Sequence, residues 1–408
     1  MSAFRFVHTA DVHLDMPFAS KSPELRRLLA DSLRRSFERA VDLAIGERVH
    51  AFLIAGDLFQ KRDPSIAAET FLLAQMRRLS AAGIHVFYCT GNHDPLRAAA
   101  GARRIEWPEG VEVFLEGVPA RRDVLAPDGR LVARVTGAGH EGPAVGENLA
   151  ARFPAVSGPL PEVALLHASI EGVGDLAPDD RYAPCATRDL RGKGYDYWAL
   201  GHVHKRSAPL NDPPAHYSGS PMGLDRTETG EKGALLVEVV PGGGARVEFR
   251  PTAPVRWEEI GIDAAGASSV EALRRHLRER IVAEGYGEGV LLSIEMEGSS
   301  PLKRALEEGE GAAELAGDLA AETGLAFLAI RTGRLRPLAD EGRARIGPLG
   351  AALDLVAALR EGREPFDPFL PELARPLPED AEERGRFLRA LLDGAEEELI
   401  DRARGEEP

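Results

Sequence analysis

Cysteine is scarce in this chain of 408 residues, and Cys89 and Cys185 make neither a disulfide framework nor a zinc-ligand spacing. We expect both to be buried small apolar residues in a protein of the reducing cytosol. No run of 18 or more apolar residues occurs, so no membrane-spanning helix is predicted. The first residues, MSAFRFVHTAD, lack a charged segment followed by an apolar one, so no signal peptide is predicted.

Positive charge is also in deficit, and the deficit is uneven. The formal net charge is −15. Residues 1–250 hold 30 Lys and Arg against 32 Asp and Glu, whereas residues 251–408 hold 20 against 33. An acidic chain is not an obvious nucleic-acid binder. Because the acidic excess lies in the C-terminal part, the front part is not excluded from binding DNA.

Apolar runs and helical patterns alternate over the first 95 residues. Strands are expected at 4–14, 50–57 and 84–94, and helices at 22–49 and 64–83. This alternation predicts a sheet with crossover helices.

Short strand candidates between Gly- and Pro-rich turns follow residue 110, and they predict a second sheet packed on the first. They span residues 111–115, 123–127, 131–139, 163–169, 195–204, 234–240 and 245–251, with a hairpin at 237–249 and one helix at 145–153. The fold class expected for residues 1–250 is therefore α/β, a two-sheet sandwich flanked by helices.

A new unit begins near residue 255. Its expected strands are 255–262, 289–297 and 325–333, and its expected helices are 269–285, 301–324 and 348–362. These elements predict a small α/β domain over residues 251–363. Residues 364–408 then combine a Pro-rich linker with a last amphipathic helix at 381–404.

Five polar clusters stand at the ends of predicted strands. They are Asp11–Val12–His13, Gly56–Asp57, Gly91–Asn92–His93–Asp94, His167, and Gly201–His202–Val203–His204. Ligands of open α/β sheets bind outside the carboxyl ends of the strands, so we expect these side chains to meet at one edge. In both pairs spaced i, i+2, an extended strand would point the two side chains to the same face.

Nitrogen and oxygen ligands without cysteine suit Mn²⁺, Fe²⁺ or Zn²⁺ rather than Ca²⁺. Asp57, alone after a glycine, is the candidate to bridge two ions. Two cations about 4 Å apart polarise phosphoryl oxygens and favour phosphoester hydrolysis. A single histidine after an apolar run is usually an ordinary one, and this is expected of the remaining histidines, His8, His50, His85, His140, His216 and His276.

The five clusters, in this order, resemble those of the calcineurin-like metallophosphoesterases. The segments HTADVHLD, GDLFQKRDPS, YCTGNHDP, LLHASIEG, YDYWALGHVHKR and YSGSPMGLD resemble the SbcD-type DNA repair exonucleases, and IEMEGSSPL resembles the capping region of YhaO-like members. The resemblance implies a metallophosphoesterase sandwich over residues 1–250 and a capping domain over 251–363.

The resemblance also implies roles for the site residues. The first of two divalent ions, most often Mn²⁺, would be held by Asp11, His13, Asp57 and His204, and the second by Asp57, Asn92, His167 and His202. His93 would not ligate but would stabilise charge and protonate the leaving oxygen. Asp94 would orient His93 or a ligand; the alternative is a plain turn cap before Pro95.

One position departs from the family pattern. Some members have a histidine three residues after the bridging aspartate, tied to exonuclease action, where this chain has Gln60. Metal binding should survive this change, whereas the strength and direction of exonuclease action are open. Lys61, Arg62, Lys205 and Arg206 flank the motifs as candidate phosphate contacts or as solvated loop charges.

The resemblance implies DNA as substrate and an SbcC-type coiled-coil ATPase as partner, with a homodimer also open. No Walker A pattern occurs, so the ATPase would be a separate chain. An apolar stripe on the final helix is a candidate docking element, with packing on its own capping domain as the alternative; its residues are Leu388, Leu391, Leu392, Leu399 and Ile400.

The sequence thus predicts a Mn²⁺-dependent DNA nuclease of DNA repair that hydrolyses phosphodiesters, with 3′–5′ exonuclease action expected and endonuclease action also open. A phosphodiesterase for small nucleotides is the alternative within the same chemistry. A protein phosphatase is disfavoured because such enzymes read G-N-H-E where this chain reads G-N-H-D. A non-catalytic regulatory subunit of a coiled-coil ATPase is disfavoured because the whole ligand set is present.

Overall fold

The structure is a computed structural model, and it describes residues 3–61, 63–95, 105–174, 180–240, 244–337, 348–366, 377–378, 380–396, 398–399 and 402. The chain divides into two compact units, Met1–Trp257 and Glu258–Pro408. Among the described residues, no helix has the length and apolar character needed to cross a membrane. Cys89 and Cys185 are both free and buried, as predicted.

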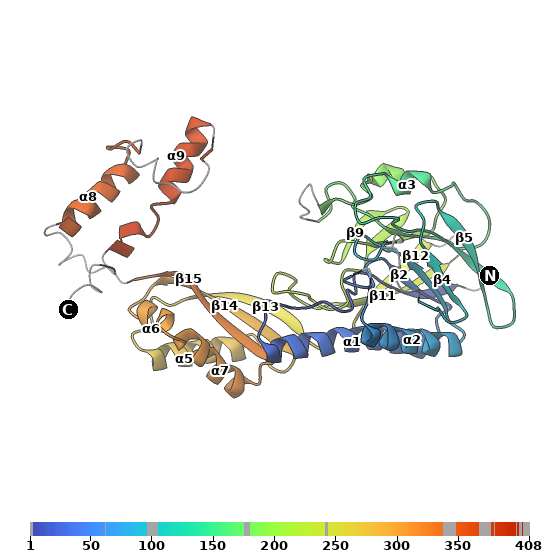
Figure 1. Ribbon diagram of the computed structural model, residues 1–408, viewed down its shortest axis with the longest axis horizontal. Helices are drawn as coiled ribbons and strands as arrows, with labels where there is room; N and C mark the ends of the chain where they lie inside the picture. The colour runs from blue at the N-terminus through green and yellow to red at the C-terminus, as the bar shows by residue number, and fades with distance from the viewer. Residues whose placement is uncertain are drawn as a thin grey trace. The chain divides into compact units, whose positions relative to one another are not determined.

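The first unit contains two six-stranded sheets (Figure 1). Across the first sheet the order is β12 (Gly244–Pro251), β11 (Gly233–Val240), β1 (Phe4–Thr9), β2 (Ala51–Ala55), β3 (His85–Cys89) and β4 (Val111–Phe114). Strands β1 to β4 are parallel, and β11 is antiparallel to both β1 and β12.

Three strands assigned by sequence to the second sheet belong to this first one, and that part of the prediction is wrong. They are β4, β11 and β12. The physical reason is long-range pairing: β11 covers the edge of β1 over the whole of Phe4–His8, more than 200 residues away in the chain. Local periodicity carries no information about such a partner.

Helices α1 (Pro23–Gly46) and α2 (Ile66–Ala81) lie along one face of the first sheet (Figure 1). Each begins at a serine whose hydroxyl accepts a backbone N–H, from Leu25 at Ser22 (3.3 Å) and from Ala68 at Ser65 (3.1 Å). These caps fix where the helices start, and so fix the lengths of the loops that leave the strand ends.

The second sheet has the order β5 (Ala120–Leu125), β6 (Leu131–Ala138), β7 (Glu162–His167), β8 (Tyr197–Gly201), β10 (Pro214–Tyr217) and β9 (Ser207–Asn211). Strands β9 and β10 were not predicted, because both are short and carry Pro or polar residues. The short helices α3 (Leu149–Arg152) and α4 (Thr187–Leu190) pack with the core on the outer face of this sheet.

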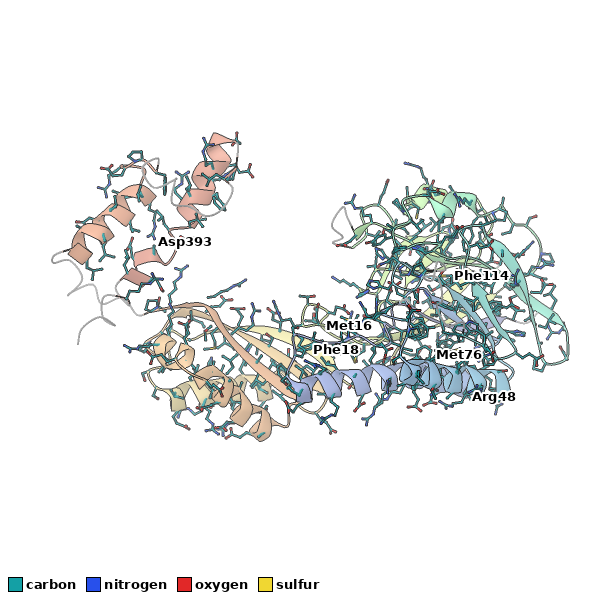
Figure 2. All side chains as sticks on the ribbon, viewed as in Figure 1. Met16, Phe18, Arg48, Met76, Phe114 and Asp393 are labelled. Carbon is teal, nitrogen blue, oxygen red and sulfur yellow. The ribbon has the colours of Figure 1, made fainter. Side chains whose placement is uncertain are left out.

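The two sheets face each other across a core that contains Phe6, Phe87, Leu165 and Tyr197. In Figure 2, Phe114 belongs to this core and Met76 belongs to the core between the first sheet and its helices. The predicted α/β sandwich of two sheets flanked by helices is confirmed.

The second unit holds a three-stranded sheet of β13 (Arg256–Asp263), β14 (Val290–Ser299) and β15 (Phe327–Arg336). Helices α5 (Val270–Ala283), α6 (Lys303–Glu307) and α7 (Gly311–Thr323) share its core (Figure 1). Helix α8 (Pro348–Arg360) and the segment after α9 (Ala381–Ala390) are joined by Arg360, which donates to the Leu392 carbonyl (2.8 Å) and pairs with Glu396 (3.1 Å).

The final helix is shorter than predicted. Helix α9 ends at Ala390, because the backbone then makes i to i−3 bonds, from Asp393 N to Ala390 O and from Ala395 N to Leu392 O. Leu388 is buried while Leu391 is 41% exposed beyond the helix end, so one continuous stripe does not form over these residues. Ile400 and most of the Pro-rich segment 364–380 lie outside the described residues.

Candidate metal centre

All five polar clusters meet at one edge of the first unit. Asp11 and His13 follow β1, Asp57 follows β2, Asn92 to Asp94 follow β3, His167 ends β7, and His202 and His204 follow β8. Contacts across the two sheets draw these ends together. The amide N–H of His202 donates to both carboxylate oxygens of Asp11 (3.0 and 3.1 Å), and the His167 Nδ1–H donates to the Ala55 carbonyl (2.9 Å).

The ligand loops are not extended strands. Strand β1 ends at Thr9, and Asp11 (φ 51°), His13 (φ 50°), Asp57 (φ 50°) and His202 (φ 106°) all have positive φ. The extended conformation assumed for the i, i+2 pairs is therefore wrong, although Asp11 and His13 do meet in one group. Instead, Asp11 N bonds Gly56 O and His13 N bonds Asp57 O, so the first two loops pair with each other. Left-handed backbone costs about 1 kcal/mol or more per residue, and such strain concentrates at functional sites.

Two motif glycines are required by close approach. A Cβ at Gly56 would lie 2.2 Å from Nδ1 of His167, and Gly56 also has φ +89°. A Cβ at Gly91 would lie 2.2 Å from Oδ1 of Asp57. The glycine that precedes each of these ligand motifs therefore makes room for a ligand from a neighbouring strand.

The candidate ligand atoms form three overlapping groups, each within 4.8 Å: Asp11, His13 and His204; Asp11, Asp57 and His167; and His13, Asp57 and His93. Asp11, His13 and Asp57 each belong to two groups, and of these the two aspartates carry a second oxygen that a shared ligand needs. Asn92 joins through its Oδ1, 3.0 Å from Nε2 of His167. The imidazole of His202 packs against that of His167, with 5.2 Å between ring centroids.

The hydrogen bonds of His167 leave a lone pair on its ring where a cation would sit. Burial lowers the pKa of His167 well below its usual value, so the ring is neutral and its Nδ1–H donates to Ala55. Its Nε2 lone pair then faces two further acceptors, Asn92 Oδ1 at 3.0 Å and Asp57 Oδ2 at 3.5 Å. Three acceptor atoms therefore point toward one another with no hydrogen between them. A bound cation would accept all three lone pairs, so these residues fit a metal.

Electrostatics support the same conclusion. Burial raises the pKa of Asp11 to about 6, and burial followed by the charges of Asp94 and Asp11 raises the pKa of Asp57 well above its usual range. Burial also lowers the pKa of His13. Within the described part of the chain, no Lys or Arg forms an ion pair with Asp11 or Asp57. Two buried carboxylates without a Lys or Arg partner among the described residues need a positive charge, which a divalent ion provides.

His93 lies beside this group and lines the cavity. Its Nδ1 is 3.3 Å from both the carbonyl oxygen and the side-chain Nε2 of Gln60. Gln60, the position that departs from the family pattern, therefore orients the His93 ring. In either hydrogen-bonding arrangement the ring nitrogen Nε2 is the one left for other partners.

Asp94 is buried behind the ligands and supports the loops. Its carboxylate accepts N–H groups of Gly91 (2.7 Å), Leu58 (2.6 Å) and Phe59 (3.1 Å) and the hydroxyl of Tyr88 (2.6 Å). These bonds tie the loop after β3 to the residues that follow Asp57. No hydrogen bond between Asp94 and the His93 ring is found among the described residues, so Asp94 acts on the ligand loops and not on that ring.

A further buried network beside His204 was not predicted. Nδ1 of His204 lies 2.7 Å from Oε1 of Glu228, whose other oxygen contacts Ser220 and Lys232. These three residues follow β10 and belong to no ligand motif. The only signal that could have identified these residues is the contact between a carboxylate and the second ring nitrogen of a candidate ligand histidine. That contact is visible in the three-dimensional structure and not in the sequence.

A cavity of about 840 Å³ opens onto Asp57, Asn92, His93, His202 and His204. Lys205 and Arg206 form part of its wall, and the Arg206 guanidinium lies 3.9 Å from the centroid of the Phe249 ring. Lys61 is exposed and Arg62 lies outside the described residues. Among the other histidines, His140 packs against His167, with 5.3 Å between ring centroids, and its Nε2 bonds the His167 carbonyl. His8, His50 and His85 bond backbone or side-chain groups, His216 stacks on Tyr197, and His276 is exposed.

Comparisons with known proteins agree with this geometry. The family model of the calcineurin-like phosphoesterases matches residues 4–206. The metallophosphoesterase YhaO of Bacillus subtilis is 34% identical over 301 residues, which cover 72% of this chain and 72% of YhaO.

Two DNA repair proteins are also similar. The DNA double-strand break repair protein Mre11 of Methanopyrus kandleri is 28% identical over 381 residues, covering 88% of this chain and 76% of Mre11. The SbcD component of the SbcCD nuclease of Rhodobacter capsulatus is 27% identical over 290 residues, covering 59% of this chain and 68% of that protein. The ligand motifs, the two-sheet sandwich and these matches together establish that the chain belongs to the calcineurin-like metallophosphoesterases, with YhaO, Mre11 and SbcD among its relatives.

Proposed function

We propose that this protein is a Mn²⁺-dependent DNA nuclease that hydrolyses phosphodiesters from 3′ ends in DNA repair. The observation that carries the proposal is the convergence of Asp11, Asp57, Asn92, His167 and His204, of which Asp57, Asn92 and His204 line a cavity with basic side chains in its wall. Similarity to the DNA double-strand break repair protein Mre11 and to the SbcCD nuclease supports DNA as the substrate.

We assign two divalent ions to the site. One would be held by Asp11, His13, Asp57 and His204, and the other by Asp57, Asn92, His167 and His202. Such ions polarise a phosphoryl oxygen and supply a hydroxide at neutral pH. The chain's own residues fix which ring nitrogen is free on the two histidines assigned to the second ion: His202 Nε2–H donates to the Asp180 carbonyl (2.8 Å), and His167 Nδ1–H donates to Ala55.

Three further parts of the cavity act on the substrate. His93 holds a proton at Nε2 and passes it to the leaving 3′ oxygen, while Gln60 fixes the ring through Nδ1. Lys205 and Arg206 bind backbone phosphates at the wall of the cavity. Gln60 cannot carry a proton, so it orients His93 without adding a second acid.

The test is digestion of end-labelled single- and double-stranded DNA with Mn²⁺ by the wild type, His93→Ala and His276→Ala. The last variant removes an exposed histidine of the second unit and serves as control. We expect His93→Ala to lose cleavage while it keeps both bound Mn²⁺ ions, because it removes the acid and not a ligand. Normal cleavage by His93→Ala would refute the assigned role.

Substrate class is separated by comparing turnover of linear DNA, a cyclic nucleotide and a model diester. A preference for the cyclic nucleotide would instead support the alternative, a phosphodiesterase for small nucleotides. A purified protein with neither bound metal nor Mn²⁺-stimulated cleavage would support a non-catalytic regulatory subunit.

We further assign residues 1–250 as the nuclease domain, 251–363 as a capping domain and 364–408 as a segment that docks an SbcC-type coiled-coil ATPase. The exposed Leu391, just beyond α9, is the residue on which docking would depend. Leu391→Asp should abolish co-elution with the ATPase and leave Mn²⁺ binding intact. Unchanged co-elution would refute this docking site.

A further inference from the structure

We propose that Glu228 is a positioning residue that selects the metal-binding tautomer of His204. The inference rests on the two-metal site proposed above and adds residues outside every ligand motif. Oε1 of Glu228 lies 2.7 Å from Nδ1 of His204. With the proton on Nδ1 donated to this carboxylate, the His204 Nε2 lone pair points to the site, where it lies 3.2 Å from Nε2 of His13.

The Glu228 carboxylate is held rigidly from its other side. Its Oε2 accepts the Ser220 hydroxyl (2.7 Å), the Lys232 ammonium (3.2 Å) and the Leu224 N–H (3.3 Å). Because three donors fix Oε2, the carboxylate cannot turn away from the imidazole. It therefore determines both the orientation and the protonated nitrogen of His204.

Lys232 holds the same histidine through its backbone. Its Nζ donates to the His204 carbonyl (2.8 Å), and the side chain is only 8% exposed. The negative charge of Glu228 and the buried positive charge of Lys232 compensate each other. Lys232 and Glu228 thus fix His204 at two points, its carbonyl and its ring. The His204 side chain is thereby held in the group of candidate ligand atoms that it forms with Asp11 and His13.

Replacing Glu228 by Gln should reverse which ring nitrogen of His204 carries the proton. If the amide oxygen faced His204, the amide NH₂ would face the Lys232 ammonium and the Leu224 N–H, all of them donors. If the oxygen faced Lys232, the NH₂ would donate to His204 Nδ1 and move the ring proton to Nε2, where it points into the metal site. The charge of Lys232 favours the second arrangement. Groups that orient metal-bound histidines change metal affinity by about 10- to 100-fold.

The experiment titrates Mn²⁺ into the metal-free full chain by calorimetry for the wild type, Glu228→Gln and Glu231→Gln. Glu231 is exposed and nearby, so its variant makes the same charge change without touching His204. We expect Glu228→Gln to bind one Mn²⁺ as the wild type does and the second about 10- to 100-fold more weakly. Glu231→Gln should match the wild type at both sites.

A second readout needs no variant. In the wild type at pH 9 with chelator, ¹⁵N–¹H correlation of the histidine rings should show His204 protonated on Nδ1. A proton on Nε2 would overturn the proposal, as would two wild-type Mn²⁺ affinities in folded Glu228→Gln. Two bound Mn²⁺ ions without DNA cleavage in the wild type would refute the nuclease proposal and leave the role of Glu228 standing.

Discussion

Gly91→Ala is the substitution expected to disrupt the metal centre with the smallest chemical change. The added Cβ would lie 2.2 Å from Oδ1 of Asp57 and 2.8 Å from its backbone nitrogen. Ordinary contacts of a Cβ begin at 3.4 Å, so the Asp57 carboxylate must move by roughly 1.2 Å. A shift of that size breaks the 2.9 Å hydrogen bond from His93 N to Oδ1.

Two energies follow from this movement. Overpacking of a filled interior costs about 1–3 kcal/mol, and the loss of a buried hydrogen bond to a charged group costs about 1.5–3 kcal/mol. Since the two effects share one displacement, we expect the free energy of unfolding in chelator to fall by about 2–4 kcal/mol. Ligand distances in metal sites tolerate only about 0.2 Å, so Asp57 should no longer serve both ions.

The assay combines urea unfolding in chelator, Mn²⁺ titration and DNA cleavage. Gly46→Ala is the control, since it adds a Cβ at the last residue of α1 with nothing within 4 Å and should stabilise by up to about 1 kcal/mol. Gly91→Ala should cleave at least about 100-fold more slowly, the usual effect of a 1 Å misplacement. Wild-type affinity for two Mn²⁺ ions in Gly91→Ala would refute the reasoning.

Three other predictions concern separate parts of the first unit. Tyr88→Phe removes the 2.6 Å bond to Asp94 and leaves no donor unpaired, so the free energy of unfolding should fall by about 1.5 kcal/mol in urea titrations. His8 is buried between the sheets, and this burial lowers its pKa to about 3. The stability that the neutral His8 ring contributes is complete above pH 6.5. As the pH falls from there toward the folded pKa, the free energy of unfolding decreases by about 1.4 kcal/mol per pH unit, and His8→Gln should reduce this dependence on pH. Arg206→Ala removes the cation stacked on Phe249 and should reduce the slope of log DNA affinity against log salt concentration by about one, the effect of one phosphate contact.

Each of these has a clear contrary result. Equal midpoints for Tyr88→Phe and wild type would show that its hydroxyl does not support Asp94. Parallel pH profiles for His8→Gln and wild type would show that another group titrates in that range. An unchanged salt slope for Arg206→Ala would place the DNA phosphates on another surface.

Strands β1 to β3 of the first sheet and the candidate ligands could be predicted because their signals are local. Asp57, Asn92 and His167 each stand within three residues of the end of an apolar run, and a strand end is visible in the sequence as the point where that run stops. The order of such ends along the chain is enough to propose a shared edge.

What escaped prediction depends on contacts between distant residues. The left-handed backbone at Asp11 and His13 arises because their loop pairs with the loop after β2. The position of β11 between β12 and β1 is set by its pairing with β1, and Glu228 is marked only by its contact with His204. None of these partners lies within the window over which periodicity acts.

The place of β11 has a consequence for the chain while it is being synthesised. Until residue 240 has left the ribosome, the edge of β1 along Phe4–His8 has no partner, and β8 with His202 and His204 is complete only shortly before. A nascent chain therefore presents an open, apolar strand edge, the kind of surface that recruits other chains. The ligand set is complete only once His204 has been synthesised, shortly before β11 can pair with β1. A bound metal ion therefore marks a first unit whose synthesis is nearly finished.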